Sequence, residues 1–183
     1  PAQLPWNVVG FCGRTAEIAA LDAVLPAHDS QPSSKVVVLS GMAGVGKTAL
    51  AVHWAHRVAA RFADGQLYVD LRGFDPGGSV MPSGDAVRGF LDALGVAAHR
   101  VPTDAGSQAA LYRSVLAGKR ILVVLDNARD ADQVRPLLPG TPGCLVVVTS
   151  RNEMPGLLAT TGAHPLTVDL LTAAESRQLL ACR

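Results

Sequence analysis

The residues with the clearest chemical potential form a glycine-rich segment, residues 41–48, that fits the pattern G-x-x-x-x-G-K-[ST]. Its glycines allow backbone conformations closed to residues with a Cβ atom, so the loop N–H groups can converge on a phosphate. Lys47 adds a positive charge for the β- and γ-phosphates, and the hydroxyl of Thr48 is a ligand for Mg²⁺. The residues expected to contact a nucleotide from this P-loop are Gly41, Ala43, Gly44, Val45, Gly46, Lys47, Thr48 and Ala49.

The sequence on both sides of the P-loop supports this interpretation. A bare eight-residue pattern is also compatible with a purely structural turn between a strand and a helix. Here residues 36–39 form an apolar run typical of a buried strand. After the loop, Leu50, Trp54 and Val58 recur at helical spacing. A strand, a glycine-rich turn and a helix therefore follow one another in the required order, which favours nucleotide binding.

Asp126 is the candidate for a second contact with the metal. It follows the apolar run 121–125, so it lies at the carboxyl end of a predicted strand, where ligands bind in open α/β folds. A Walker B aspartate that holds Mg²⁺ belongs at this position. The alternative is a turn residue, since Asp126 and Asn127 also suit a turn. With a P-loop upstream, the metal role is favoured, and the predicted metal ligands are Thr48 and Asp126.

Asn127 argues against fast catalysis. Many P-loop ATPases place a carboxylate next to the Mg²⁺ aspartate, where it accepts a proton from the attacking water. An amide has no useful basicity and can at most orient that water through hydrogen bonds. We therefore expect slow intrinsic hydrolysis.

Arg151 is the third candidate catalytic residue, after Lys47 and Asp126. It follows the apolar run 144–149, and an arginine at this sheet edge can reach a γ-phosphate and report its presence. The alternative is a surface arginine paired with a nearby acid. The sensing role is favoured.

Five short, nearly continuous apolar runs alternate with helical segments, which is typical of a parallel sheet covered on both faces. The expected fold is α/β: a P-loop NTPase three-layer sandwich with a mainly parallel five-stranded sheet, in which the strand carrying Asp126 is not adjacent to the P-loop strand. The predicted strands are 35–39, 66–71, 121–125, 144–149 and 166–170. The predicted helices are 15–25, 48–62, 83–94, 105–117, 130–138 and 171–180.

The composition sets bounds on the function. The chain has 183 residues, about one domain, and 49% of them are hydrophobic, enough for a sizeable core. The formal net charge of +1 gives no electrostatic footprint for nucleic acid or an anionic membrane. No apolar run is long enough to span a bilayer. The three cysteines (Cys12, Cys144 and Cys182) have no disulfide or zinc pattern, which favours a reducing cytoplasm. His53 and His56 are expected to be partly exposed side chains on a helix.

Several of these motifs together resemble a known family. Residues 11–18, 41–48, 122–127 and 147–151 are similar to the NB-ARC nucleotide-binding domain of the STAND class of P-loop ATPases. Within that class, residues 67–76 and 126–130 resemble the central ATPase domain of actinobacterial SARP-type transcriptional regulators. The similarity covers essentially the whole chain.

The resemblance implies adenine as the base and places Phe11, Cys12 and Arg14 against the adenine and ribose. It also implies Arg151 as the first sensor arginine. The expected divisions are 1–34 for the adenine-contacting segment and its helix, 35–171 for the nucleotide-binding core, and 172–183 for the start of a truncated helical subdomain. Thr172 and Glu175 fit a capping box that begins the last helix.

The function expected from these observations is an ATP/ADP-binding regulatory switch with slow ATPase activity and bound Mg²⁺, within a larger cytoplasmic transcriptional regulator. The resemblance implies a DNA-binding region before this domain and helical repeats after it. Nucleotide-dependent self-association is possible, whereas no membrane or direct nucleic-acid contact is expected. The alternatives are a free-standing P-loop phosphotransferase or ATPase, a DNA-stimulated motor, and a module in which nucleotide only stabilises the fold.

Overall fold

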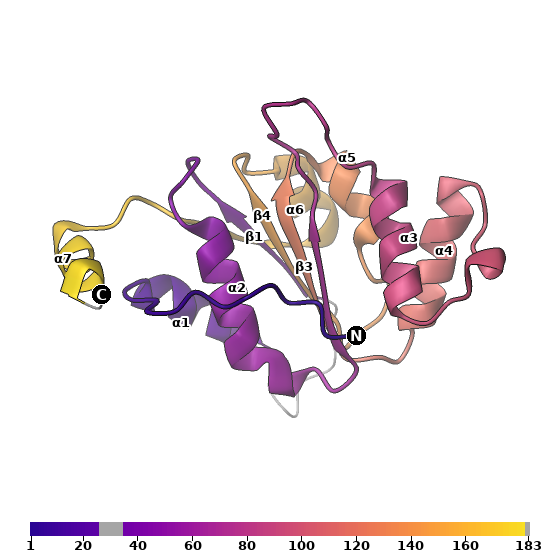
Figure 1. The fold of residues 1–183 in the computed structure, drawn as a ribbon, viewed down its shortest axis with the longest axis horizontal. Coiled ribbons are helices and arrows are strands. Elements are labelled where there is room, and N and C mark those ends of the chain that lie inside the picture. Colours follow the sequence, from indigo (N-terminus) through magenta and orange to yellow (C-terminus); the bar gives the residue numbers. More distant parts are fainter. Residues whose placement is uncertain (26–34, 182–183) are drawn as a thin grey trace.

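The computed structural model describes residues 1–25 and 35–181, which form an α/β domain around one five-stranded sheet (Figure 1). The strand order is β2-β3-β4-β1-β5, and every neighbouring pair is parallel. The strands are β1 (Lys35–Ser40), β2 (Gly65–Asp70), β3 (Ile121–Ala128), β4 (Leu145–Ser150) and β5 (His164–Thr167). Because β4 lies between β1 and β3, the predicted separation of the P-loop strand from the strand of Asp126 is confirmed.

Helices cover both faces of the sheet, as the continuous apolar strands require. The α-helices are α1 (Thr15–Val24), α2 (Lys47–Val58), α3 (Ser83–Ala93), α4 (Ala105–Leu116), α5 (Ala131–Val134), α6 (Pro155–Thr161) and α7 (Ala173–Ala181). Short 3₁₀ turns are η1 (Ala59–Arg61), η2 (Ala98–Arg100) and η3 (Arg135–Leu137). In Figure 1, α1 and α2 lie on one side of the sheet and α3 and α4 on the other.

Two apolar clusters, one on each face, hold these layers together. One contains Leu50, Trp54 and Val58 of α2, packed with alternate residues of the central strands. The other contains side chains of α3 and α4 packed against the remaining strand residues, with Phe90 and Tyr112 fully or almost fully buried. The three-layer fold class is therefore confirmed.

Two predicted strand boundaries are wrong, and one helix was not predicted. β3 does not stop at Leu125 but continues to Ala128, with a shift in its register against β4. The strand predicted at 166–170 is β5, which begins at His164 and ends at Thr167. The sequence analysis did not predict the helix α6, although Pro155 at its start is well suited to the first position of a helix.

The start of α7 matches the predicted capping box. The backbone N–H of Glu175 donates to the hydroxyl of Thr172, and the carboxylate of Glu175 accepts from the Thr172 N–H at 2.9 Å. The same carboxylate lies 3.4 Å from the backbone nitrogen of Arg14. The last helix is thus linked to the N-terminal segment, although the two are far apart in sequence.

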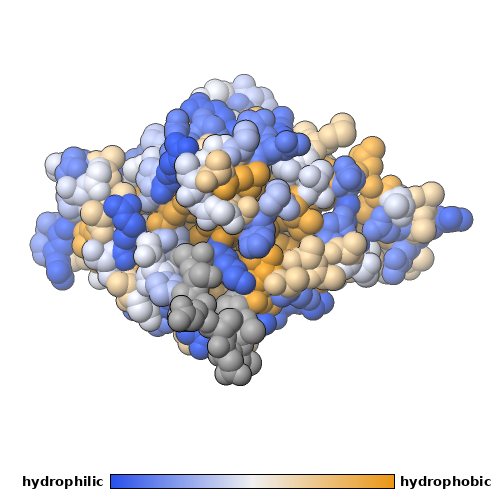
Figure 2. Space-filling model, turned by 180° about the vertical axis from the view of Figure 1, so that it is seen from behind, coloured by the Kyte–Doolittle hydropathy of each residue, from blue (hydrophilic) through white to orange (hydrophobic). Residues whose placement is uncertain are grey.

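Two further expectations can be compared with the structure. No helix in the described part of the chain is long and apolar enough to cross a membrane, and Figure 2 shows hydrophobic and hydrophilic side chains interspersed on the back of the molecule.

The expectation that the cysteines form no disulfide is wrong for Cys12, which is disulfide-bonded. The spacing of the cysteines along the chain gave no indication of this bond. Cys144 is a buried free thiol.

Candidate nucleotide site

The P-loop lies between β1 and α2, and its glycines take the conformations that the motif predicted. Gly44 and Gly46 have φ angles of 76° and 98°, and α2 begins immediately after them at Lys47. Gly41 has a φ angle of 148°, and a Cβ atom there would lie 2.3 Å from the carbonyl oxygen of Val168. The loop therefore requires glycine at Gly41 for space as well as for conformation.

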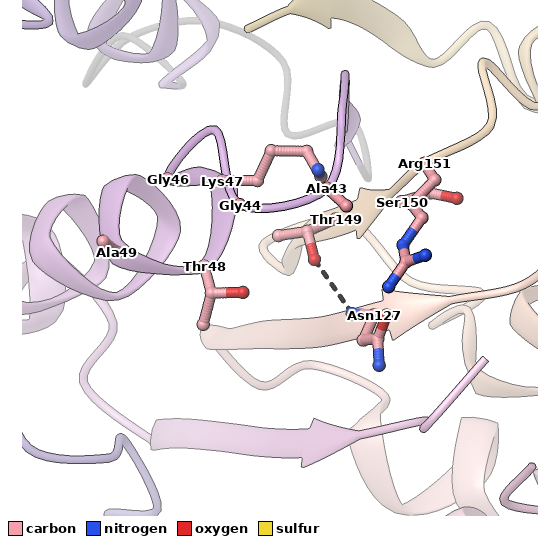
Figure 3. Close-up of a pocket in the computed structure, with 10 residues that line it drawn as sticks. All are labelled: Ala43, Gly44, Gly46, Lys47, Thr48, Ala49, Asn127, Thr149, Ser150 and Arg151. Atoms are coloured by element: carbon pink, nitrogen blue, oxygen red, sulfur yellow. Dashed lines mark hydrogen bonds between the residues drawn. The ribbon is translucent and has the colours of Figure 1, made fainter. Parts of the chain in front are cut away.

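A cavity of about 310 Å³ opens between the P-loop and the carboxyl ends of β3 and β4. Figure 3 shows side chains from these three elements around it, with Lys47 and Thr48 on one side and Arg151 on the other. The lining residues are Ala43, Gly44, Gly46, Lys47, Thr48, Ala49, Asn127, Thr149, Ser150 and Arg151. Segments from three separate parts of the chain thus form one concave site.

The ammonium group of Lys47 folds back onto its own loop. Its Nζ donates to the carbonyl oxygens of Gly41 at 2.8 Å and Met42 at 2.6 Å. Burial lowers the pKa of Lys47, and the positive charge of Arg151 lowers it further, while the charge of Asp126 acts in the opposite direction. An anion placed between Lys47 and Arg151 would be attracted by both cations.

Asp126 is buried and accepts hydrogen bonds from three hydroxyl groups. Its Oδ1 accepts from Thr48 at 2.8 Å and from Thr149 at 2.5 Å, and its Oδ2 accepts from Tyr68 at 3.0 Å. Burial raises the pKa of the Tyr68 phenol, and the negative charge of Asp126 raises it further. Tyr68 therefore stays protonated and acts as a donor to the carboxylate.

This arrangement fits Mg²⁺. The ion is usually held by one or two protein oxygen ligands together with phosphate oxygens and water. Thr48 Oγ1 and the Asp126 carboxylate supply such oxygens side by side. Among the described residues there is no cluster of three or more His, Cys, Asp or Glu side chains that could hold a metal ion. The donor set thus suits a metal that arrives with a nucleotide.

Asn127 lies next to this carboxylate in an unusual backbone conformation, with a φ angle of 55°. Its N–H donates to Thr149 Oγ1 at 2.9 Å (Figure 3). The register of β3 against β4 shifts between Leu125 and Ala128, so the chain at Asn127 departs from regular strand geometry. Asn127 lines the cavity, next to Asp126 in the sequence, and its side chain supplies no base there.

Arg151 follows β4 and lines the cavity, as the sequence predicted. Its guanidinium carbon lies 4.8 Å from the ring centre of Phe74, in the loop that follows β2. Such a cation–π contact is weak at an exposed site. The sensor candidate is thus held near the site by a contact that a phosphate could replace.

The N-terminal segment contacts the P-loop, but Phe11, Cys12 and Arg14 do not line either of the two cavities beside that loop. The Arg14 guanidinium donates to the carbonyl of Val45 at 2.9 Å and pairs with Glu17 at 2.7 Å. Phe11 stacks on His53 of α2, with ring centres 4.2 Å apart. The second cavity, about 790 Å³, is lined by Gly41 and Val45 among others, but neither cavity is lined by Phe11, Cys12 or Arg14. Their adenine contact stays a prediction.

Replacing Gly41 with alanine is expected to destabilise the fold by about 1–3 kcal/mol, because of its strained φ and the close carbonyl of Val168. The matched control is Gly44→Ala, which has a positive φ but open space around the new methyl group. It should cost only about 1 kcal/mol. Urea unfolding of both variants measures the difference, and equal losses would contradict the steric explanation.

The environment of His53 on α2 predicts a pH effect on stability. Burial lowers the pKa of His53, and the nearby charges of Arg57 and His56 lower it further. Near the ordinary histidine pKa of about 6.5, the unfolded chain therefore binds more protons than the folded chain. The free energy of unfolding should fall as the pH drops from about 7 to about 5, and His53→Gln should lose part of that fall. Identical pH profiles would contradict this role.

Comparison with known proteins agrees with this geometry. The model of a family described as the AAA ATPase domain matches residues 10–168. The chain belongs to this family. The match includes the P-loop, Asp126 and Arg151, and it excludes α7.

The AAA ATPase domain of this chain has close relatives among regulators. It is 50% identical to the regulatory protein AfsR of Streptomyces coelicolor over 98% of the chain, and 48% identical to AfsR of Streptomyces griseus. It spans only 18% of the length of either relative. The predicted resemblance to the ATPase domain of such regulators is confirmed.

Two solved structures have a similar fold. Cdc6p from Pyrobaculum aerophilum has a TM-score of 0.70 at 16% identity, over 100% of this chain and 50% of that one. The STAND protein PH0952 from Pyrococcus horikoshii, which has a tetratricopeptide repeat sensor, has a TM-score of 0.57 at 17% identity, over 98% of this chain and 26% of that one. At these identities the likeness supports the P-loop ATPase fold alone.

Proposed function

We propose that this ATPase domain is an ATP/ADP-binding switch with slow hydrolysis, acting within a larger transcriptional regulator. The observation that carries the proposal is the cavity that joins the P-loop to Arg151, with Thr48 hydrogen-bonded to Asp126 beside it. A nucleotide with Mg²⁺ would be held by Gly41–Thr48 of the loop and by Asp126, and the metal would neutralise phosphate charge there.

The switch requires contacts that distinguish ATP from ADP, because a ligand shifts an equilibrium only by its differential affinity for the two states. The γ-phosphate would lie between Lys47 and Arg151, and ADP would leave Arg151 without that contact. Arg151 is held meanwhile over Phe74. Arg151 would therefore contact the γ-phosphate in the ATP state and Phe74 in the ADP state, which gives the two states different structures at the sheet edge.

Slow hydrolysis follows from Asn127, which occupies the position beside Asp126 without a basic group. A slow reaction suits a switch, because the ATP state must last long enough to be read. It argues against a motor or a free-standing phosphotransferase, both of which need rapid turnover.

The setting of the domain is also part of the proposal. The 50% identity to AfsR, and the 18% of AfsR that the chain spans, support a place among other domains of one polypeptide. We propose that this polypeptide acts in the cytoplasm. A DNA-binding region before the chain and helical repeats after it would read the nucleotide state, directly or by self-association. We assign 1–34 to nucleotide-base contacts by Phe11, Cys12 and Arg14, 35–171 to the core, and 172–183 to the next subdomain.

The test is to identify and count the nucleotide that co-purifies with the 183-residue chain, by mass spectrometry. Calorimetric titration with ATP and ADP, each with and without Mg²⁺, should then give binding to both and a stronger effect of Mg²⁺ on ATP. Turnover of many ATP molecules per second without a partner would overturn the slow switch. Failure to bind either nucleotide would overturn the proposal as a whole.

A further inference from the structure

A second carboxylate, Asp70, lies at the same sheet edge as Asp126. β2 and β3 are parallel and pair in register, with Asp70 directly opposite Asp126. Register partners on neighbouring strands direct their side chains to the same face of the sheet, with the strands about 4.8 Å apart. Tyr68, two residues before Asp70 on that face, reaches Asp126 with its hydroxyl group. Asp70 thus stands beside Asp126 on the face covered by α2.

Asp70 contacts Asn127, which lines the cavity, but Asp70 itself does not line it. Its Oδ1 is 3.5 Å from the Asn127 Nδ2, and Asn127 lines the cavity together with Lys47 and Thr48. In Figure 3 the Asn127 side chain points away from Lys47. The charge of Asp70 also helps to raise the pKa of Tyr68, after burial and Asp126. The cavity, the Asn127 amide and the Asp70 carboxylate therefore follow one another in space.

The Asp70 carboxylate is oriented by the backbone. The N–H of Arg72 donates to Oδ1 at 2.8 Å, the same atom that faces Asn127. In the described part of the chain no hydrogen bond engages Oδ2, and the residue is exposed. One oxygen is thus anchored, and the other can accept a proton and release it to solvent.

We propose that Asp70 is the general base for ATP hydrolysis in this domain, which rests on the proposed function. The water oxygen forms a bond to the γ-phosphorus, and the bond from that phosphorus to the β–γ bridging oxygen breaks, with its electron pair leaving on ADP. Because Asp70 does not line the cavity, the proton of the attacking water passes through a second water to Asp70 Oδ2 and from there to solvent. Asn127, which lines the cavity and contacts Asp70, orients this second water through its amide.

This placement also accounts for slow turnover. The base stands on the neighbouring strand and does not line the cavity, so the proton reaches it only through a second water. A well-placed general base contributes about 10²- to 10⁴-fold to a rate. A base that acts through a second water supplies the low end of that range.

The test compares single-turnover ATP hydrolysis by the 183-residue chain with that of Asp70→Asn. The amide keeps the acceptor for the Arg72 N–H, and it removes only the basicity. We expect a rate about 100-fold lower, with the affinities for Mg²⁺–ATP and Mg²⁺–ADP unchanged. Asp70→Glu should keep at least the original rate. A second readout is the nucleotide left on the protein after incubation with ATP: mass spectrometry should find ADP on the unchanged chain and ATP on Asp70→Asn.

The matched control is Asp75→Asn, since Asp75 is a carboxylate of the next loop that likewise accepts a backbone N–H, from Ser79. It should hydrolyse ATP as the unchanged chain does. If Asp70→Asn hydrolysed ATP at the original rate, the inference would be overturned and the switch proposal would stand. The same holds if the original chain binds ATP but does not hydrolyse it. A large shift in Mg²⁺ dependence would make Asp70 a metal ligand instead. A chain that binds no nucleotide overturns both proposals.

Discussion

Lys47→Ala is expected to weaken ATP binding by roughly tenfold to a hundredfold, because a hydrogen bond to a charged group contributes about 1.5–3 kcal/mol. In the structure the Lys47 ammonium stays on the carbonyls of Gly41 and Met42, at the mouth of the loop. Its lowered pKa reflects first burial and then the charge of Arg151. A phosphate between the two cations would relieve their repulsion, and alanine would leave Arg151 to act alone.

Calorimetry with ATP and ADP measures this effect, and the loss should be larger for ATP because Lys47 reaches the γ-phosphate as well. Lys35→Ala is the matched control, since Lys35 begins β1 at the opposite end of the strand from the P-loop. It should bind both nucleotides normally. Equal affinity of Lys47→Ala and the unchanged chain would show that the phosphates bind elsewhere.

The sequence predicted the P-loop and its partners because local chemistry determines them. Glycine is the residue that most readily takes the positive φ angles found at Gly44 and Gly46, and the apolar runs on both sides specify the strand and the helix. Asp126 and Arg151 were predicted for the same reason, since each comes at the carboxyl end of an apolar run in the sequence. Parallel strands then bring these residues to one edge whatever the length of chain between them.

The contacts that depend on register or on loops could not be predicted in the same way. The Tyr68 hydroxyl reaches Asp126 only because β2 pairs with β3 in one particular register, which strand propensity does not specify. The available signal was alternation: Tyr68 and Asp70 lie on the same side of a strand that ends beside Asp126. Arg151 meets Phe74 through the fold of a turn-rich loop, for which the sequence offers no periodicity.

The extension of β3 shows how a local rule can be overridden. Asp126 and Asn127 favour a turn by propensity, and the strand was expected to end there. Instead the N–H groups of Leu71 and Gly73 donate to the carbonyls of Asp126 and Asn127, at 2.8 and 2.7 Å. A Cβ atom on Gly73 would lie 2.3 Å from the backbone nitrogen of Arg129, so only glycine allows this approach. The loop after β2 thereby holds the far end of β3.

Trp54→Ala should lower the free energy of unfolding by about 3–5 kcal/mol, a large part of the total for a domain of this size. Trp54 is fully buried in α2, and its indole N–H donates to Asp22 of α1 at 2.8 Å. Asp22 also pairs with Arg57, one turn further along α2. The substitution therefore removes both a core side chain and the contact that holds α1 on α2.

Trp54→Phe separates these two contributions, because it keeps an aromatic ring in the core and removes only the N–H donor and part of the volume. We expect a loss of about 1–2 kcal/mol, since the half-exposed Asp22 keeps its pairing with Arg57. Trp6→Ala is the matched control: Trp6, the second tryptophan, is 90% exposed and should change stability by less than about 0.5 kcal/mol. Urea unfolding followed by circular dichroism measures all three. If Trp54→Phe lost as much as Trp54→Ala, the bond to Asp22 would outweigh core packing in holding α1 beside the P-loop helix.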